Sequence, residues 1–241
     1  MGLDYGEEDF VLDPISEGVI RAIQLILSGD PEVYGITALS LFVSISGTLL
    51  SSVWSVPLSA VLAFRNFPGR GVIKGLFNAL IGIPTVALGL CLYLLLSRSG
   101  PFGILQLLYT PYAIIIGQCV LVTPIIVSFT TSALESVDPD LRTLARTLGA
   151  SSRQTDAVVL REAQWGVVLA VLAAFNRAFA ELGVAMMLGG NIRNFTRVLT
   201  TAIALQTAMG EIAVSIALSI ILLAIVVSLS IVINIARKSP R

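Results

Sequence analysis

The 241-residue sequence contains no histidine, and its only lysines are Lys74 and Lys238. The absence of histidine argues against most metal sites and against acid–base catalysis near neutral pH. The chain has no Gly-x-x-x-x-Gly-Lys-Ser/Thr motif, so it does not hydrolyse ATP through a phosphate-binding loop. Gly-x-Ser-x-Gly, His-Glu-x-x-His and Cys-x-x-Cys motifs are also missing, which leaves an enzyme active site within the membrane unsupported. Cys91 and Cys119 lie in apolar stretches and are interpreted as packing residues.

Charge is scarce as well. Only 12% of the residues are charged, about half of the roughly 25% that is usual in soluble domains, and 56% are hydrophobic. The mean hydropathy is +0.91. These values predict an all-α integral membrane protein. The net charge of zero hides an uneven distribution, because residues 1–32 carry eight acidic residues against one base, Arg21.

Five segments are long and apolar enough to cross a bilayer, which takes about 20 residues. They are 33–64, 75–97, 112–134, 165–188 and 212–236. The apolar stretch 198–210 is too short and is typical of a re-entrant or interfacial helix on the outer side. Residues 15–28 place polar and apolar side chains on separate stripes, which predicts an amphipathic helix on the membrane surface.

Basic residues give the orientation, because they concentrate on the cytoplasmic side of membrane proteins. Ten of the fifteen basic residues lie in connections and a tail that fall on the same side of the five spans. This predicts an outer acidic N-terminus and a cytoplasmic C-terminus. We therefore divide the chain into an acidic segment (1–32), a transmembrane domain (33–236) with a cytoplasmic loop (138–162), and a basic tail (237–241). The residues behind this assignment are Arg65, Arg70, Lys74, Arg142, Arg146, Arg153, Arg161, Arg237, Lys238 and Arg241.

Pro57, Pro84 and Pro124 lie inside the first three spans. Each removes a backbone hydrogen bond and favours a kink. Such kinks suit helices that move to open a pore, but static bends explain them equally well.

The cytoplasmic loop carries the clearest local signals. Asp138 and Pro139 suit the start of a helix, Gly149 suits its end, and Ser151 with Gln154 can form a capping box for a second helix. The first helix is amphipathic. Its apolar stripe could dock in a partner's groove while Arg142 and Arg146 contact acidic groups or phospholipid. The alternative is a solvated loop.

This loop resembles the "EAA" loop of ABC importer permeases, which reads Glu-Ala-Ala, three residues, Gly, nine residues, Ile, one residue, Leu-Pro. Here the pattern is Thr143-Leu144-Ala145, three residues, Gly149 and then Val159. Thr143 replaces the glutamate, and Arg161-Glu162 stand where Leu-Pro is expected. The resemblance implies a coupling helix around 138–156 that inserts into the ATP-hydrolysing subunit. The residues it assigns to this contact are Pro139, Leu141, Arg142, Leu144, Ala145, Arg146, Gly149, Ala150 and Ser151.

A second stretch, residues 175–205, is similar to the fourth span and outer loop of tungstate importer permeases. The likeness runs from about Val33 onward and leaves residues 1–32 outside. It implies the type I permease fold of ABC importers in the cytoplasmic membrane. The implied partners are a second copy of the chain, two ATPase subunits, an external tungstate-binding protein and membrane lipid. ATP and Mg would be bound by the ATPase, with no cofactor, metal or nucleic acid on this chain.

Two other functions stay open. The same machine could carry molybdate, sulfate or another oxyanion. A channel or secondary transporter that works without ATP is more distant, because such transporters often have several intramembrane acids and inverted repeats. Here Glu181 is the only acid inside a predicted span, and five spans do not divide into equal halves.

Arg177 and Glu181 are the charged residues inside a predicted span. A charged side chain at a helix centre facing lipid costs about 2.5–3.5 kcal/mol, so both should face protein, water or each other. Their four-residue spacing allows them to pair on a helix. Together with Gly183 they are interpreted as part of the translocation path or gate. A static ion pair that locks the fourth span is an equal alternative.

The outer loop after that span offers a second candidate site. Gly189, Gly190 and Asn191 could turn backbone N–H groups toward an anion, with Arg193 and Arg197 adding positive charge at an outer mouth. A tight turn before the short helix 198–210 is the favoured alternative. Hydroxyl residues along the first span could form a hydrophilic path, although such residues more often support close helix packing.

Overall fold

The computed structural model describes residues 9–238. The acidic residues Asp4, Glu7 and Glu8 and the basic Arg241 lie outside the described residues. The elements are α1 (Asp9–Ser28), α2 (Pro31–Phe64), α3 (Arg70–Leu80), α4 (Thr85–Leu96), a 3₁₀ helix (Gly103–Leu105), α5 (Pro111–Glu135), α6 (Pro139–Thr147), α7 (Ser152–Glu162), α8 (Gln164–Phe179), α9 (Gly183–Gly189), α10 (Leu199–Ala208) and α11 (Ile212–Lys238). Residues 9–238 contain no strand, as the sequence predicts.

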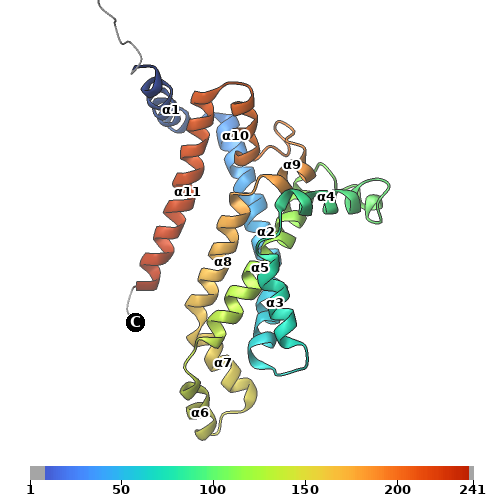
Figure 1. Cartoon of the computed structure of the whole chain (residues 1–241). Helices are drawn as coiled ribbons and strands as arrows, with labels where there is room; N and C mark the ends of the chain where they lie inside the picture. The colour runs from blue at the N-terminus through green and yellow to red at the C-terminus, as the bar shows by residue number, and fades with distance from the viewer. Residues whose placement is uncertain (1–8, 239–241) are drawn as a thin grey trace, which may run out of the picture.

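The centre of the bundle is the contact between α2 and α5, with α8 packed against both (Figure 1). Small hydroxyl residues and a glycine on α2 permit this close approach. Ser51 shares a hydrogen bond of 2.9 Å with Thr123 of α5, and Ser59 donates to the Val127 carbonyl at 3.2 Å. A Cβ atom on Gly47 would lie 3.1 Å from the Gln118 side chain. The hydroxyl residues of the first span therefore serve helix packing, the alternative that the sequence favours.

Among the described residues, three helices are long and apolar enough to cross a membrane. They are α2, α5 and the part of α11 from Ile212 to Ile231. Two bent pairs, α3 with α4 and α7 with α8, raise the number of possible spans to five if each pair counts as one. This number agrees with the five predicted spans, although two of those spans differ in detail.

The second predicted span, 75–97, is wrong as a single helix. It consists of α3 and α4, which meet at 102°, and α4 projects sideways from the bundle (Figure 1). The break falls at Pro84, which lacks an N–H for a continuing helix and becomes the N-cap of α4. Pro57 and Pro124 do not break α2 and α5, since each helix continues on both sides of its proline.

The fourth predicted span, 165–188, is also interrupted. Helix α8 ends at Phe179 and α9 begins at Gly183, so Glu181 lies in the break and not on a helix. The long element at this position is instead the pair α7 and α8, bent by 60°. The carboxylate of Glu181 accepts the Val184 N–H at 3.1 Å, which satisfies a donor that a helix start leaves free.

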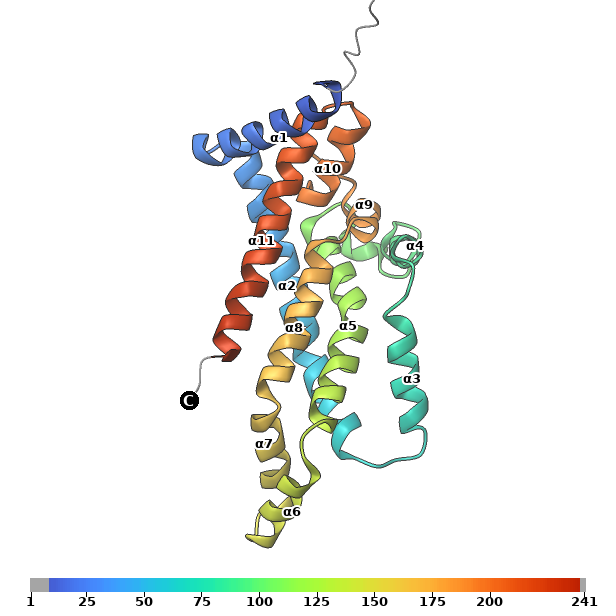
Figure 2. The same ribbon diagram turned by 60° about the vertical axis from the view of Figure 1, so that its left-hand side comes forward.

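The predicted amphipathic helix 15–28 lies within the longer α1, which crosses the end of α11 (Figure 2). Gly18 faces Ile216 of α11, whereas Val19, Ile23 and Ile26 are exposed. Its location on a membrane surface stays a prediction. The short helix predicted within 198–210 is confirmed as α10, which a turn at Gly210 joins to α11. Its place on the outer side stays a prediction.

The two ends of the bundle differ in charge. Helices α6 and α7 and the connection between α2 and α3 lie at one end, and α1 and α10 lie at the other (Figure 1). Arg65 and Arg70 flank the α2–α3 connection, and Arg142 and Arg146 lie on α6. These basic residues thus share one end of the molecule, the arrangement from which we predict the cytoplasmic side.

Candidate functional site

Helix α6 forms where the sequence predicts it. Asp138 Oδ1 accepts the Asp140 N–H at 2.9 Å, and Pro139 is the first helical residue. Gly149 has φ = +85°, a left-handed conformation that favours glycine, and the Ala150 N–H donates to the Ala145 carbonyl at 3.0 Å. A capping box between Ser151 and Gln154 then starts α7. The predicted helix, glycine turn and second helix are confirmed.

Helix α6 buries none of its own residues against the rest of the chain. The side chains of Leu144 and Leu148 are 57% and 79% exposed. A cavity of about 770 Å³ lies between α6 and the adjoining ends of α5 and α8, and Leu141 and Leu144 line it. An apolar face presented in this way is suited to a partner protein.

Helix α7, in contrast, is firmly anchored. Val159 is completely buried with Ala63 of α2 and Leu134 of α5. Asp156 pairs with Arg65 at 3.3 Å. Helix α7 therefore connects α6 to the ends of α2 and α5.

Arg142 contacts the end of α2 in the single chain, and its predicted contact with a partner or phospholipid stays a prediction. Its guanidinium lies over the Phe64 ring, 5.0 Å from the ring centroid. This cation–π contact ties α6 to the end of α2. Arg146, in the last turn of α6, is exposed.

The predicted pair of Arg177 and Glu181 is present, with Nη1 and Oε2 2.5 Å apart. Glu181 is 2% exposed, and each carboxylate oxygen has a donor, Arg177 for one and the Val184 N–H for the other. The Glu181 carbonyl accepts the Thr200 hydroxyl at 2.7 Å. These contacts join α8, α9 and α10, so the pair has a structural role whatever else it does.

A cavity of about 520 Å³ adjoins this pair, and Arg177, Glu181, Gly183 and Thr85 contribute to its wall. The side chain of Arg177 is 37% exposed, so the pair is open to the cavity on the arginine side. Thr85, at the start of α4, lies where a Cβ atom on Gly183 would come within 2.7 Å of its Oγ1. The break between α8 and α9 therefore meets the break between α3 and α4.

Gly183→Ala should destabilise the protein, because the added methyl group would push α4 away from α9. Overpacking of this kind costs about 1–3 kcal/mol. Gly75→Ala is the matched control, since a Cβ atom on this helical glycine meets nothing within 4 Å. Thermal unfolding of the two purified variants measures the difference. An unfolding midpoint for Gly183→Ala at or above that of Gly75→Ala would contradict the tight contact.

At the predicted outer mouth, the loop is a closed turn. Gly190 and Asn191 have φ of +70° and +52°, and the Gly190 N–H donates to the Met186 carbonyl at 3.0 Å. The Ile192 N–H donates to Thr196 Oγ1 at 2.9 Å. With these donors engaged, the geometry favours the tight turn over an anion-binding nest. Gly189 is buried, and a Cβ atom there would lie 2.7 Å from Ile114.

Glu32, at the start of α2, forms ion pairs with both arginines of this loop, so one negative charge is shared between two positive ones. Its carboxylate lies 2.5 Å from Arg193 Nη2 and 3.5 Å from Arg197 Nη1. The carboxylate raises the pKa of Arg193 above its usual range by accepting its hydrogen bond and by charge attraction. The sequence does not predict this contact, because the partners are 161 residues apart. Nothing in the sequence distinguishes Glu32 from the other acidic residues of 1–32.

Comparison with known proteins places this geometry in context. Residues 55–239 match the family described as "Binding-protein-dependent transport system inner membrane component". A probable anion ABC transporter permease of Haloferax volcanii is 44% identical over 78% of this chain and 83% of its own length. The tungstate uptake system permease TupB of Peptoclostridium acidaminophilum is 37% identical over 92% of this chain and 97% of its own. TupB of Campylobacter jejuni is 33% identical over 88% and 89%.

One expectation about coverage needs correction. The match to the first TupB leaves 8% of the chain outside, which is fewer residues than 1–32 contains, so the likeness extends into that segment. The match at 55–239 includes α5 to α9, and with them the exposed helix α6 and the broken span beside Arg177. The chain belongs to the family of inner-membrane components of binding-protein-dependent transport systems.

Proposed function

We propose that this chain is the membrane-spanning permease subunit of an ABC importer that carries tungstate into the cell. The observation that carries the proposal is helix α6, where Leu144 and the C-cap residue Leu148 are exposed while α7 is anchored in the bundle. Family membership supports a transport role, and two tungstate permeases that match 88% and 92% of the chain support the substrate.

In the proposed mechanism, ATP and Mg bind a separate ATPase subunit, and α6 inserts into it on the cytoplasmic side. Closure of the ATPase dimer moves the α6 helices of two copies of this chain, and α7 passes the motion to α2 and α5. The pore then opens outward and receives the oxyanion from an external binding protein. The N-terminus is outside and the C-terminus cytoplasmic, because this places the basic end of the bundle inside the cell.

The same machine carrying molybdate, sulfate or another oxyanion is the nearest alternative. These oxyanions resemble tungstate in charge and general shape, so the pore need only pass a dianion. Selection then falls mainly to the binding protein, whose preformed site can distinguish the ions.

The test is reconstitution of the complex with its ATPase and binding protein in liposomes. At equal, limiting concentrations of each ion, tungstate should stimulate ATP hydrolysis and uptake more than molybdate or sulfate does, because the binding protein selects the ion. Equal stimulation by all three would overturn the assignment to tungstate. Uptake that persists without the ATPase would overturn the ABC mechanism.

A further inference from the structure

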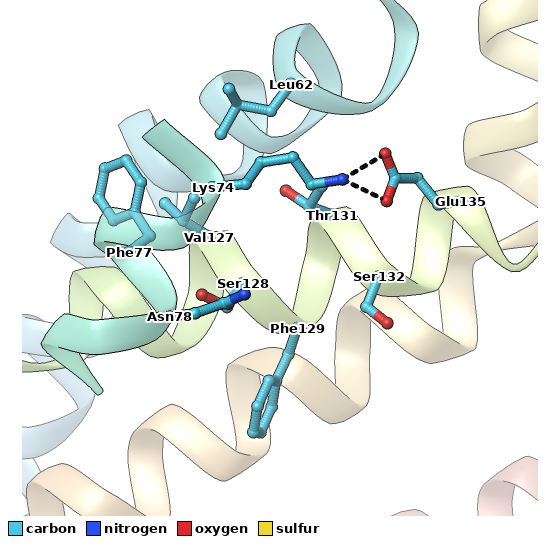
Figure 3. Close-up of a pocket in the computed structure, with 10 residues that line it drawn as sticks. All are labelled: Leu62, Lys74, Phe77, Asn78, Val127, Ser128, Phe129, Thr131, Ser132 and Glu135. Atoms are coloured by element: carbon cyan, nitrogen blue, oxygen red, sulfur yellow. Dashed lines mark hydrogen bonds and ion pairs between the residues drawn. The ribbon is translucent and has the colours of Figure 1, made fainter. Parts of the chain in front are cut away.

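A polar cavity of about 340 Å³ lies between α3 and α5 (Figure 3). Its wall shares no residue with the cavity beside Arg177 and Glu181. Its volume is near the lower end of the roughly 300–1,000 Å³ that small-molecule sites occupy. The wall combines one cation with an amide, three hydroxyl groups and one carboxylate. These residues are Lys74, Asn78, Ser128, Thr131, Ser132 and Glu135.

Glu135 is shared by two cations. Its carboxylate oxygens lie 2.7 and 2.6 Å from Lys74 Nζ, and Arg70 binds the same carboxylate. Arg70 has other acceptors, because it donates to the Leu62 carbonyl at 2.6 Å and to Asn66 Oδ1 at 3.0 Å. Within the described residues, Lys74 donates its hydrogen bonds to Glu135 alone. If Glu135 turned toward Arg70, the Lys74 ammonium would face the cavity without a counter-ion.

Two hydroxyl groups of this wall have no hydrogen-bond partner among the described residues, Ser128 Oγ and Thr131 Oγ1. Thr131 is only 3% exposed, and burial of a polar group without a partner is costly. Figure 3 shows Thr131 beside the Lys74–Glu135 contact. The two hydroxyl oxygens have almost no exposed surface, so a rotation of each side chain would bring its hydroxyl to an anion held by Lys74.

We propose that this cavity is a binding site for a tetrahedral oxyanion at the inner end of the transport path. The anion displaces Glu135 from Lys74 and accepts hydrogen bonds from Lys74, Asn78 and the hydroxyls. Glu135 acts as a built-in competitor that keeps binding weak, because a transported ion must be able to leave. The proposal rests on the proposed function for the direction of transport, since the cavity lies at the end of the bundle that carries α6.

The first test measures tungstate binding to the complex of this chain with its ATPase, without binding protein, in phosphatidylcholine nanodiscs. Glu135→Gln should tighten binding about tenfold, and Lys74→Gln should weaken it about tenfold, as expected when a charge-assisted contact is freed or lost. Asp156→Asn and Arg65→Gln are matched controls, because that pair lies at the same end and outside the cavity wall. Both controls should leave binding unchanged.

Thr131→Val keeps the test decisive if a charge variant fails to assemble. It replaces a buried hydroxyl that has no partner, so the fold should keep its stability while tungstate binding weakens several-fold. Binding that is absent in both the wild type and Glu135→Gln, or unaffected by Lys74→Gln and Thr131→Val, would overturn the site. Uptake driven by loaded binding protein could still succeed in that case, which separates this failure from failure of the proposed function.

A lipid phosphate offers the same chemistry as a free oxyanion. Nanodiscs that contain phosphatidylglycerol should give the same tungstate affinity as phosphatidylcholine nanodiscs. Loss of tungstate binding in the anionic lipid would overturn the assignment to a free oxyanion. Repeating the titrations with molybdate and sulfate should give the same order of variants, because the wall recognises charge and oxygen atoms; a reversed order would contradict the proposal.

Discussion

Leu148→Asp should uncouple the permease from its ATPase and reduce tungstate uptake at least tenfold. Leu148 is 79% exposed, so the substitution should leave the fold of the chain intact. Burial of one leucine contributes about 1.5–3 kcal/mol, and each 1.4 kcal/mol is a factor of ten in affinity. Loss of this contact, together with a charge placed in an apolar groove, should weaken the subunit contact about 10- to 100-fold.

Co-purification with the ATPase and uptake by reconstituted complexes measure this effect. Thr147→Asp is the matched control, because it adds the same charge to the same helix one residue away from the leucine. Leu148→Met should retain most activity, since it keeps an apolar side chain of similar size. If Leu148→Asp and Thr147→Asp behaved alike, docking of α6 through its leucines would be ruled out.

Arg177→Gln should reduce the yield of folded complex far more than Glu181→Gln does. Removing the arginine leaves the Glu181 carboxylate, 2% exposed, without its counter-ion, and breaking a buried pair in this way costs about 3–5 kcal/mol. Removing the glutamate charge leaves Arg177 partly hydrated by the cavity, because its side chain is 37% exposed. A glutamine at 181 can also still accept the Val184 N–H.

The double variant Arg177→Gln/Glu181→Gln should recover most of the lost yield, because no unpaired buried charge remains. Size-exclusion profiles and thermal unfolding of the complexes provide the measurement. Equal losses in the two single variants would contradict the asymmetry. If the pair also acts as a gate, Glu181→Gln should change basal ATP hydrolysis or uptake while assembly stays intact.

The features that the sequence predicts well are those set by nearby residues. Asp138, Gly149 and the Ser151–Gln154 box act within a few residues, so their hydrogen bonds follow from local geometry. The pairing of Arg177 with Glu181 follows in the same way from a four-residue spacing. The three longest spans follow from uninterrupted apolar composition.

The features that the sequence does not predict depend on distant parts of the chain. Three prolines occur in predicted spans, but only Pro84 breaks its helix. Helices α2 and α5 continue through Pro57 and Pro124. Glu135 meets Lys74 and Glu32 meets Arg193, although these partners are 61 and 161 residues apart in the sequence. Only the folded bundle places these residues side by side.

The close contact between α2 and α5 limits how the protein can move. Hydroxyls such as Ser51 and Ser59 join the two helices, and Gly47 leaves no space between them. Tightly packed interfaces shift between discrete arrangements and do not deform continuously, so α2, α5 and the attached α8 should turn as a single rigid body. The apolar part of α11 is largely exposed. Helix α3, in contrast, is joined to α5 by the ion pairs of Arg70 and Lys74 with Glu135. We therefore expect the opening and closing of a pore to be a rotation of the central body, with α3 attached, relative to α11.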